Sequence, residues 1–447
     1  MIRDNRLTDN DYARNFTDIH PPFETRDAAL VDANRCLFCY DAPCTKSCPT
    51  GIDVPKFIKQ IATDDIKGSA RTIFISNIMG GGCSRVCPVE KLCEGACVYN
   101  LMEEAPIPIA RLQRYPTDQA IRHKWPLFAR KASNGHRVAI IGAGPAGLSA
   151  AHTLSREGVD VTIYEKEEKG GGLMTYGVAA YKVTPEYCLE ELEYILSLGG
   201  ITIQFSTELG KDVQLEQLRD EYDAVFLAFG VGLARRLGIP GEDLSGVVDA
   251  LRFIYAIRTD GFPSVPVGDK VAVIGMGMTA IDAATQARRL GAGEVTLVYR
   301  RTEEEMPCTE KELEIARLDG CRIHWLAAPD KLIGLEGRVT QLRCQKMELG
   351  PPDAGGRRMP RPTGETFDMD VDMVIKATGQ MPFEDLVATG GLSHRNGKIG
   401  TTGSHGITSF PGVFAGGDCV NGGKEVVDAV QAGKLSAAAI LSYLQTV

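Results

Sequence analysis

Residues 138–147 read Val-Ala-Ile-Ile-Gly-Ala-Gly-Pro-Ala-Gly, and this stretch decides how the rest of the chain is interpreted. Four apolar residues suit a buried parallel strand, and the G-x-G-x-x-G turn after them opens a helix. Its glycines allow a tight turn, a close approach to a pyrophosphate, and tight packing of helix on strand. A second predicted strand, residues 159–165, ends in Glu165, where a ribose-binding carboxylate belongs. The stretch therefore predicts a dinucleotide-binding fold, and an ordinary glycine-rich loop is the plainer alternative.

Length, composition and charge narrow the class of protein. The 447 residues suffice for roughly three domains. A net charge of −9 disfavours a nucleic-acid or anionic-membrane surface. The first residues lack the apolar core of a signal peptide, and no apolar run reaches a membrane span, so we expect a cytoplasmic protein. Thirteen cysteines in such a chain indicate metal or redox chemistry.

Eight of the 13 cysteines lie between Cys36 and Cys97. The first group, residues 36–49, has the spacing C-x2-C-x4-C-x3-C-P of a ferredoxin-like run, whose fourth cysteine commonly serves a different cluster. A second group spans residues 83–97, and residues 54–78 between the groups show helical spacing. We expect a mostly helical domain with two iron–sulfur clusters. Structural zinc is the alternative, which the proline after Cys48 and Cys87 disfavours. The other five cysteines are expected to be structural.

Two further segments connect these regions. Residues 106–116 and 131–135 are interpreted as a linker into the nucleotide-binding part. Residues 170–177 form a glycine-rich turn, which is expected to let the backbone approach an isoalloxazine ring, although a simple loop has the same composition.

A second nucleotide fingerprint occupies residues 271–280, Val-Ala-Val-Ile-Gly-Met-Gly-Met-Thr-Ala. It follows an apolar strand, opens a helix, and returns through a strand at residues 294–298. Here the strand is followed by Tyr299, Arg300 and Arg301 in place of an acid. A carboxylate repels a ribose 2′-phosphate and arginines bind it, so this copy predicts NADPH. A solvated surface arginine pair is the alternative.

The last part of the chain is expected to return to the first domain. Residues 371–379 are predicted as a strand ending in Ala-Thr-Gly, and residues 411–418 as one ending in Gly-Gly-Asp before a helix. Asp418 is placed to bond flavin ribityl or phosphate oxygens. The predicted fold class is α/β: a helical iron–sulfur domain (1–130), then two Rossmann-like domains, the second inserted in the first. Their boundaries are 131–264 and 377–447 for FAD, and 265–376 for NAD(P)H.

With these motifs, the chain resembles the two-dinucleotide-fold flavoproteins that include the glutamate synthase small subunit. It resembles more closely the N-terminal half of dihydropyrimidine dehydrogenase and the separate small subunit of the bacterial versions. The specific parts are Asp-Ala-Pro-Cys at 41–44, the interval from Cys87 to Cys93, and Ile-Ala-Arg-Leu-Gln-Arg-Tyr at 109–115. Glutamate synthase small subunits have a shorter interval and a glutamate in place of Gln113. Both differences favour the pyrimidine enzymes.

The resemblance also implies site residues. One 4Fe–4S cluster would be held by Cys36, Cys39, Cys44 and Cys97, and the other by Cys48, Cys87, Cys93 and Gln113, with Cys83 a bystander. Contacts to FAD would come from Val86, Gly142, Gly144, Pro145, Ala146, Gly147, Glu165, Gly172, Leu173, Gly417 and Asp418. The NADP side would comprise Lys182 near the nicotinamide, Gly275, Gly277, Thr279, Ala280, Arg300, Arg301 and Gly379. Lys182 and Met278 depart from the arginine and aspartate that the family usually has there.

The resulting hypothesis is an electron-input subunit. A flavin accepts a hydride from NADPH and gives up single electrons, which clusters accept. The family's pyrimidine site, FMN and active cysteine lie in a part absent from this chain, so no catalytic residue for pyrimidine chemistry is expected here. The expected partner is an FMN- and iron–sulfur-containing subunit with a dihydroorotate-dehydrogenase-like barrel, in a hetero-oligomer that reduces uracil or thymine. The alternatives are the small subunit of glutamate synthase or of another NADPH-dependent reductase, and a zinc-containing, nucleotide-sensing scaffold.

Overall fold

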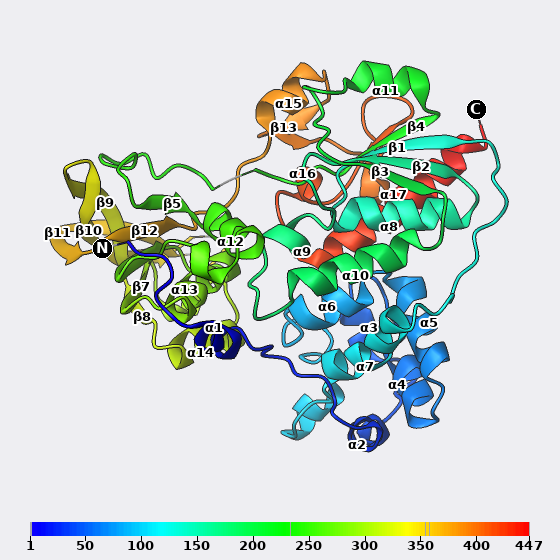
Figure 1. The fold of residues 1–447 in the computed structure, drawn as a ribbon, viewed down its shortest axis with the longest axis horizontal. Coiled ribbons are helices and arrows are strands. Elements are labelled where there is room, and N and C mark those ends of the chain that lie inside the picture. Colours follow the sequence, from blue (N-terminus) through cyan, green and yellow to red (C-terminus); the bar gives the residue numbers. More distant parts are fainter. Residues whose placement is uncertain (1, 233, 354, 357, 447) are drawn as a thin grey trace. The chain divides into compact units, whose positions relative to one another are not determined.

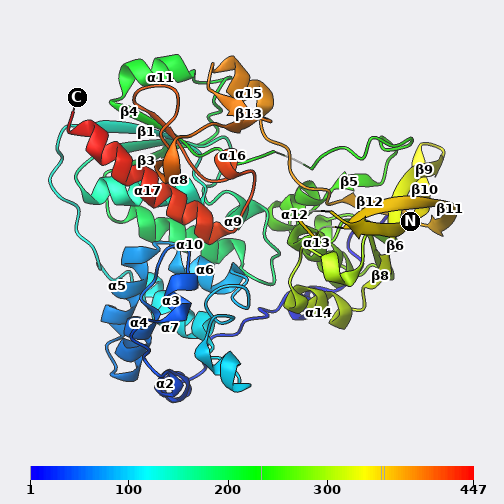
Figure 2. The ribbon, with the colours of Figure 1, turned by 180° about the vertical axis from the view of Figure 1, so that it is seen from behind.

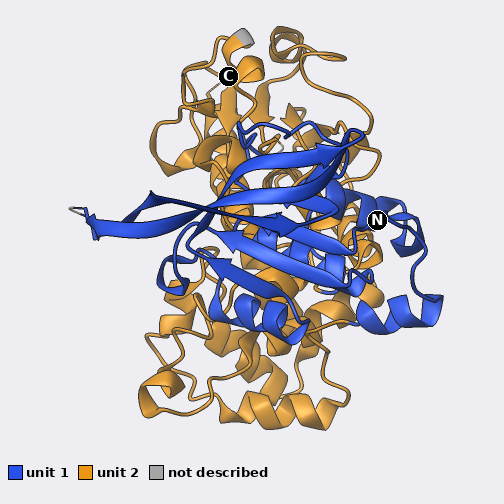
Figure 3. Ribbon diagram, turned by 90° about the vertical axis from the view of Figure 1, so that its left-hand side faces the viewer, with its two compact units in different colours: residues 1–17, 176–181, 233–381 blue, residues 18–175, 182–232, 382–447 orange. Residues whose placement is uncertain are grey.

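A computed structural model describes residues 2–232, 234–353, 355–356 and 358–446. The chain divides into two compact units, which Figure 3 colours separately. Unit 1 comprises residues 1–17, 176–181 and 233–381, and unit 2 comprises residues 18–175, 182–232 and 382–447. Each unit contains one parallel sheet with a nucleotide fingerprint, which confirms the α/β class predicted from the sequence.

Unit 2 begins with the predicted helical domain (Figure 1). The helical spacing at residues 54–78 corresponds to two helices, and the side chain of Asp65 caps the second by accepting from Gly68 N. Phe57, Ile61 and Ile73 are fully buried between the helices. The helices of this domain are α2 (Arg26–Arg35), α3 (Pro43–Ser47), α4 (Val54–Ala62), α5 (Ile66–Ser76), α6 (Gly80–Val86), η1 (Val98–Met102) and α7 (Ile109–Arg122).

The linker predicted at residues 106–116 is wrong from residue 109 onward, because α7 begins at Ile109 and contains Pro116. Ile109, Leu112 and Ile121 of α7 are buried. Packing of this apolar face outweighs the backbone hydrogen bond that a proline inside a helix removes. The helix matters for the site because it carries Gln113.

The sheet of unit 2 has the strand order β15-β4-β1-β2-β3, with all neighbours parallel. Its strands are β1 (Arg137–Ile141), β2 (Asp160–Tyr164), β3 (Ile201–Gln204), β4 (Ala224–Leu227) and β15 (Val413–Ala415). The central strands are continuous apolar runs because helices cover both faces. The main helices are α8 (Pro145–Arg156), α9 (Leu173–Tyr176), α10 (Pro185–Leu196), α11 (Leu215–Glu221), α15 (Glu384–Thr389), α16 (Asp418–Asn421) and α17 (Val426–Leu444).

Helix α17 lies directly along α8, as Figure 2 shows. The Ser149 hydroxyl of α8 donates to the carbonyl of Val430 at 2.8 Å. The C-terminal helix therefore supports the helix that the first fingerprint opens. Small elements complete this part: β13 (His394–Arg395), β14 (Lys398–Ile399) and η4 (Gly403–His405).

The sheet of unit 1 repeats the same plan with the order β5-β12-β6-β7-β8, again all parallel. Its strands are β5 (Val247–Asp249), β6 (Lys270–Ile274), β7 (Glu294–Tyr299), β8 (Arg322–Trp325) and β12 (Met373–Lys376). Its helices are α1 (Asp9–Asn15), α12 (Ala250–Thr259), η2 (Phe262–Ser264), α13 (Met278–Arg289), η3 (Glu303–Glu305) and α14 (Glu310–Leu318). A second, antiparallel sheet consists of β9 (Ala327–Leu335), β10 (Arg338–Pro352) and β11 (Arg358–Asp370).

The structure assigns several segments to unit 1 that the sequence had placed elsewhere. The strand predicted at residues 371–379 is β12 and pairs with β6, so it belongs to the second sheet, within the bounds 265–376 and not with the last part of the chain in the first sheet. Apolar patterning identifies a strand but not the sheet that it joins. Elements β5 and α12, which precede residue 265, also belong to unit 1. So does the N-terminal arm, in which the ring of Phe16 stacks on Phe262 at 3.9 Å.

Among the described residues, no helix combines the length and the apolar character that a membrane crossing requires.

Candidate cofactor sites

Four cysteines of unit 2 line one cavity: Cys36, Cys39, Cys44 and Cys97. Cys36 directly follows α2, Cys39 lies between α2 and α3, Cys44 lies in α3, and Cys97 precedes η1. The rest of the lining is mainly apolar and includes Val54, Ile58, Ile107 and Ile109. Burial raises the pKa of the Cys44 thiol to about 11, and the neighbouring thiols of Cys36 and Cys97 add to the rise. These are the four residues that the family resemblance grouped together.

This arrangement fits an iron–sulfur cluster. Four thiolates around an apolar cavity repel one another, and ligation by a cationic centre removes that cost because it stabilises the deprotonated form. No three His, Cys, Asp or Glu side chains in the described ranges converge as ligands of a single metal ion do. Four cysteine thiolates are the ligand set of a 4Fe–4S cluster.

A second group of thiols lies near the end of α6. A hydrogen bond with Cys83 and burial raise the pKa of Cys87, and the thiols of Cys93 and Cys48 contribute. Cys48 and Cys44 in turn raise the pKa of Cys93, which burial already raises strongly. These effects show that Cys48, Cys87 and Cys93 lie near one another. Cys83, expected to be a bystander, is buried and lies within hydrogen-bond reach of Cys87.

Gln113 is buried in α7 against α6. Its Nε2 donates to the carbonyl of Gly80 at 2.6 Å. That bond leaves the amide oxygen as the atom of this side chain that can act as a ligand. This bond fixes the orientation of Gln113 against α6, the helix that leads to Cys87.

Lys434 of α17 is a neighbour of the second group that the sequence did not reveal. Its Nζ donates to the carbonyl of Thr50 at 3.0 Å and to that of Ser76 at 2.9 Å. The ammonium group also interacts with the Cys48 thiol, while burial lowers the pKa of Lys434. No local pattern signals this contact, because 384 residues separate Lys434 from Thr50.

The first fingerprint has the geometry of a dinucleotide site. Gly142 has φ 102°, and a β-carbon there would lie 2.5 Å from the carbonyl oxygen of Ala228. Gly144 is the N-cap of α8, Pro145 and Ala146 form its first turn, and Gly147 follows on the sheet side. Glu165 is 6% exposed, and its Oε2 accepts from the backbone N–H of Ala143 at 2.7 Å. Burial raises the pKa of this carboxyl.

Other residues predicted to contact FAD lie around this turn. A β-carbon at Gly172 would lie 2.9 Å from the Cα of Gly144, so the glycine-rich turn at 170–177 passes directly over the fingerprint. Leu173 begins α9 and is 37% exposed. Gly417 precedes α16, and the Asp418 carboxylate accepts from Lys424 N at 3.1 Å. Val86 stands apart from these as the last residue of α6, next to Cys87.

The second fingerprint repeats this backbone in unit 1. Gly275 has φ 133°, and a β-carbon there would lie 2.4 Å from the carbonyl oxygen of Ala377. Gly277 is the N-cap of α13, and Thr279 and Ala280 lie in its first turn. Gly379 has φ 85° and follows β12 with open space beside it.

The two arginines after β7 differ in their surroundings. Arg300 is exposed, whereas Arg301 is 8% exposed. Within the described part of the chain, the Nε and Nη2 of Arg301 are buried and have no hydrogen-bond partner. A buried guanidinium without acceptors is costly, and an anionic ligand would satisfy it.

Lys182 lies in unit 2, unlike the other residues expected on the NADP side. It is 6% exposed and follows directly after the segment 176–181 of unit 1.

Two families of known proteins match the chain, one in its N-terminal part and one in the rest. Residues 136–433 match the family described as pyridine nucleotide-disulphide oxidoreductase. Residues 12–125 match the family described as dihydropyrimidine dehydrogenase domain II, 4Fe-4S cluster.

Individual relatives cover almost the whole chain. The NAD-dependent dihydropyrimidine dehydrogenase subunit PreT of Escherichia coli K12 is 37% identical, over 97% of this chain and 98% of the relative. The glutamate synthase [NADPH] small chain of the same strain is 36% identical, over 96% and 94%. The structure of Mycobacterium tuberculosis FprA in complex with NADPH is 21% identical, with a TM-score of 0.59 over 70% of this chain and 85% of FprA, and shows a shared fold.

These matches confirm an electron-transferring oxidoreductase with a nucleotide part and a 4Fe–4S part. The chain belongs to the pyridine nucleotide-disulphide oxidoreductase family, in the group that carries an N-terminal 4Fe–4S domain and includes PreT and the glutamate synthase small chain.

Proposed function

We propose that this chain is the electron-input subunit of an NADPH-dependent dihydropyrimidine dehydrogenase. The observation that carries the proposal is the cavity lined by Cys36, Cys39, Cys44 and Cys97 in the same unit as the first dinucleotide fold. Bound FAD and two 4Fe–4S clusters would supply the conversion of a hydride from NADPH into single electrons for a partner subunit.

The residues of unit 2 would bind FAD and hold the clusters. The turn at Gly142 and Gly144 would let the pyrophosphate approach the start of α8, and Glu165 would accept from the ribose hydroxyls. Cys36, Cys39, Cys44 and Cys97 would bind one cluster. The other would be bound by Cys48, Cys87, Cys93 and the amide oxygen of Gln113.

A Cys93→Ser variant is expected to lose one cluster, whereas its matched control Cys83→Ser keeps both, as measured by iron content per chain.

The residues of unit 1 would select the nucleotide. The backbone at Gly275 and Gly277 admits the pyrophosphate, and Arg301 supplies two unsatisfied N–H groups to a 2′-phosphate. Arg300 adds a second positive charge at the surface. The related PreT is named as NAD-dependent, so this arginine pair is the feature that predicts a preference for NADPH in the present chain.

The features that favour a pyrimidine substrate and an FMN-containing partner lie in and around the second cysteine group. Gln113 and the interval from Cys87 to Cys93 favour the pyrimidine enzymes over glutamate synthase. The overall identities, 37% and 36%, do not separate the two, and glutamate synthase remains the second candidate because of its equally extensive match.

The test is NADPH oxidation by the chain purified together with its native partner, run without oxygen. Uracil or thymine is expected to be consumed in step with NADPH, yielding the 5,6-dihydro product. If only glutamine plus 2-oxoglutarate supports NADPH oxidation, the pyrimidine assignment is refuted and the second candidate takes its place.

A further inference from the structure

A buried carboxylate of α10, Glu191, has no role in the sites described above. It is 1% exposed, and its Oε1 accepts from the backbone N–H of Gly82 at 2.9 Å. Its Oε2 is buried and has no hydrogen-bond partner among the residues that the structure describes. Carboxylates of this kind are rare in protein interiors because burial without full pairing is costly.

Glu191 lies where two candidate cofactor regions meet. A β-carbon at Gly82 would lie 2.7 Å from Oε2 of Glu191 and 2.7 Å from Cε of Met174. Gly82 belongs to α6, which leads to Cys87, and Met174 follows Leu173 in the turn assigned to FAD. The backbone of α6 therefore approaches α10 with no side chain between them, and the carboxylate faces both regions.

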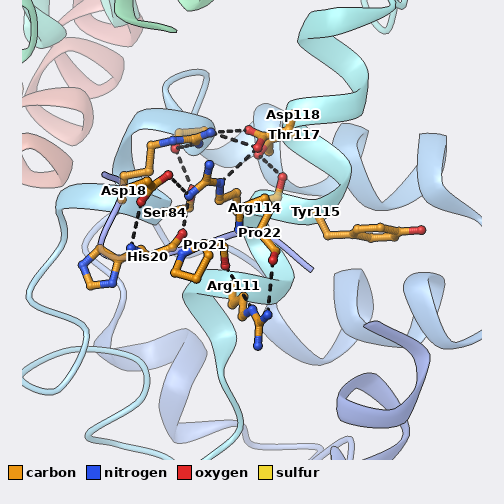
Figure 4. A network of polar contacts seen from close by, with 12 residues as sticks. Asp18, His20, Pro21, Pro22, Ser84, Arg111, Arg114, Tyr115, Thr117 and Asp118 are labelled. Carbon is orange, nitrogen blue, oxygen red and sulfur yellow. Dashed lines mark hydrogen bonds and ion pairs between the residues drawn. The ribbon is translucent and has the colours of Figure 1, made fainter. Parts of the chain in front are cut away.

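The charged side chains near Glu191 compensate one another without a contribution from its carboxylate. Nη2 of Arg85 donates to both carboxylate oxygens of Asp118, at 2.8 and 2.9 Å. Asp118 also accepts from Arg114, which pairs with Asp18 at 2.6 Å (Figure 4). Two arginines and two aspartates thus compensate one another, so ionised Glu191 would leave the network with an uncompensated negative charge.

Tyr187 is a further titratable neighbour of Glu191 among the described residues. Arg85 lies 3.5 Å over its ring, and its hydroxyl is buried near Asp118 and Glu191. Burial raises the pKa of Glu191 to about 7, against the opposing effects of the Gly82 amide and Arg85. A carboxyl in this range changes its protonation state when one more charge appears nearby.

We propose that Glu191 takes up a proton when an electron arrives at the adjacent cluster and releases it when the electron leaves. For each electron that adds one negative charge, one proton from solvent forms an O–H bond with the Glu191 carboxylate, and no other bond changes. Both are lost when the electron passes to the partner. This inference rests on the proposed function, because it needs the second cluster beside α6.

The experiment is an electrochemical titration of the cofactor-loaded chain with mediators, followed by cluster absorbance and electron paramagnetic resonance, over pH values on both sides of 7. The midpoint potential of one cluster is expected to be constant at low pH. Above the carboxyl pKa it should fall by up to about 59 mV for each tenfold decrease in proton concentration. In Glu191→Gln this dependence should vanish, whereas Glu190→Gln, an exposed neighbour on α10, should retain it. A pH dependence that persists in Glu191→Gln would overturn the proposal.

A second measurement needs no variant. The infrared difference between the reduced and oxidised wild-type chain should contain a new carbonyl band of a protonated carboxylic acid, and its absence would also refute the role of Glu191. Neither measurement uses NADPH or a partner. Failure of NADPH to reduce the chain would therefore count against the proposed function and leave this test intact.

Discussion

The two dinucleotide folds of this chain share one backbone plan and differ in the charge that follows the second strand. Gly142 and Gly275 both have positive φ, and each lies against the carbonyl of the residue that follows a neighbouring strand, Ala228 and Ala377. After β2 the first fold carries Glu165, whereas after β7 the second carries Arg300 and Arg301. The backbone of both folds suits a pyrophosphate, and we propose that the charge decides which ribose each accepts.

The two folds also differ in how their charges are satisfied. Glu165 accepts backbone hydrogen bonds from Ala143 and Glu167 without any ligand. Arg301 has two buried nitrogen atoms without acceptors within the described residues. The first site is therefore complete as an internal structure, whereas an anion would complete the second. This difference suits a tightly held FAD and an NADPH that must bind and leave in every cycle.

The largest expected effect comes from placing a methyl group at the two equivalent glycines. Gly142→Ala should prevent FAD binding, and Gly275→Ala should leave the flavin in place but abolish its reduction by NADPH. In each case the new β-carbon would collide with a backbone carbonyl at a φ that alanine disfavours, at a cost of about 1–3 kcal/mol or more. Flavin absorbance and anaerobic reduction measure the two effects. Loss of flavin from Gly275→Ala as well would show that the folds are not independent sites.

An intermediate effect is expected at the arginines. Arg301→Ala should raise the KM for NADPH by about 10- to 100-fold, because charge-assisted hydrogen bonds to a phosphate are worth roughly 1.5–3 kcal/mol, and should leave the KM for NADH nearly unchanged. Arg300→Ala, the exposed control, should have a smaller effect. Steady-state kinetics with a one-electron dye as acceptor give both constants. Equal changes for NADPH and NADH would mean that Arg301 does not contact the 2′-phosphate.

The smallest effect concerns Glu165. Its pKa is raised in the folded state, so this carboxyl favours folding at low pH, and the contribution is lost as pH rises through the raised pKa. In the FAD-free chain, Glu165→Gln should remove this dependence. We compare the free energy of unfolding of the wild type with that of the variant. The difference, wild type minus variant, should decrease as the pH is raised from a value below the ordinary glutamate pKa. Denaturant titrations at several pH values test this, and a difference that increases with pH would contradict the assigned sign.

Local geometry was the part of the fold that the sequence predicted best. The fingerprints at Gly142 and Gly275 each depend on a few adjacent residues, and the sequence alone shows where glycine is required. One cavity is lined by Cys36, Cys39, Cys44 and Cys97, which a family resemblance, and not their spacing, had grouped together.

Long-range contacts were not predictable in this way. Three such contacts connect segments that lie far apart in the sequence. They are the pairing of β12 with β6, the hydrogen bonds of Lys434 to Thr50 and Ser76, and the hydrogen bond between Glu191 and Gly82. Glu191 in particular lies in a helix with several other glutamates, and only burial distinguishes it from the exposed Glu190.

The most direct test of the account is an anaerobic titration of the isolated, cofactor-loaded chain with NADPH and, separately, with NADH. The account predicts that NADPH bleaches the flavin band and the broad iron–sulfur absorbance at far lower concentrations than NADH does. A flavin that dithionite reduces but NADPH leaves unchanged would contradict the claim that the second fold delivers electrons from NADPH to the first.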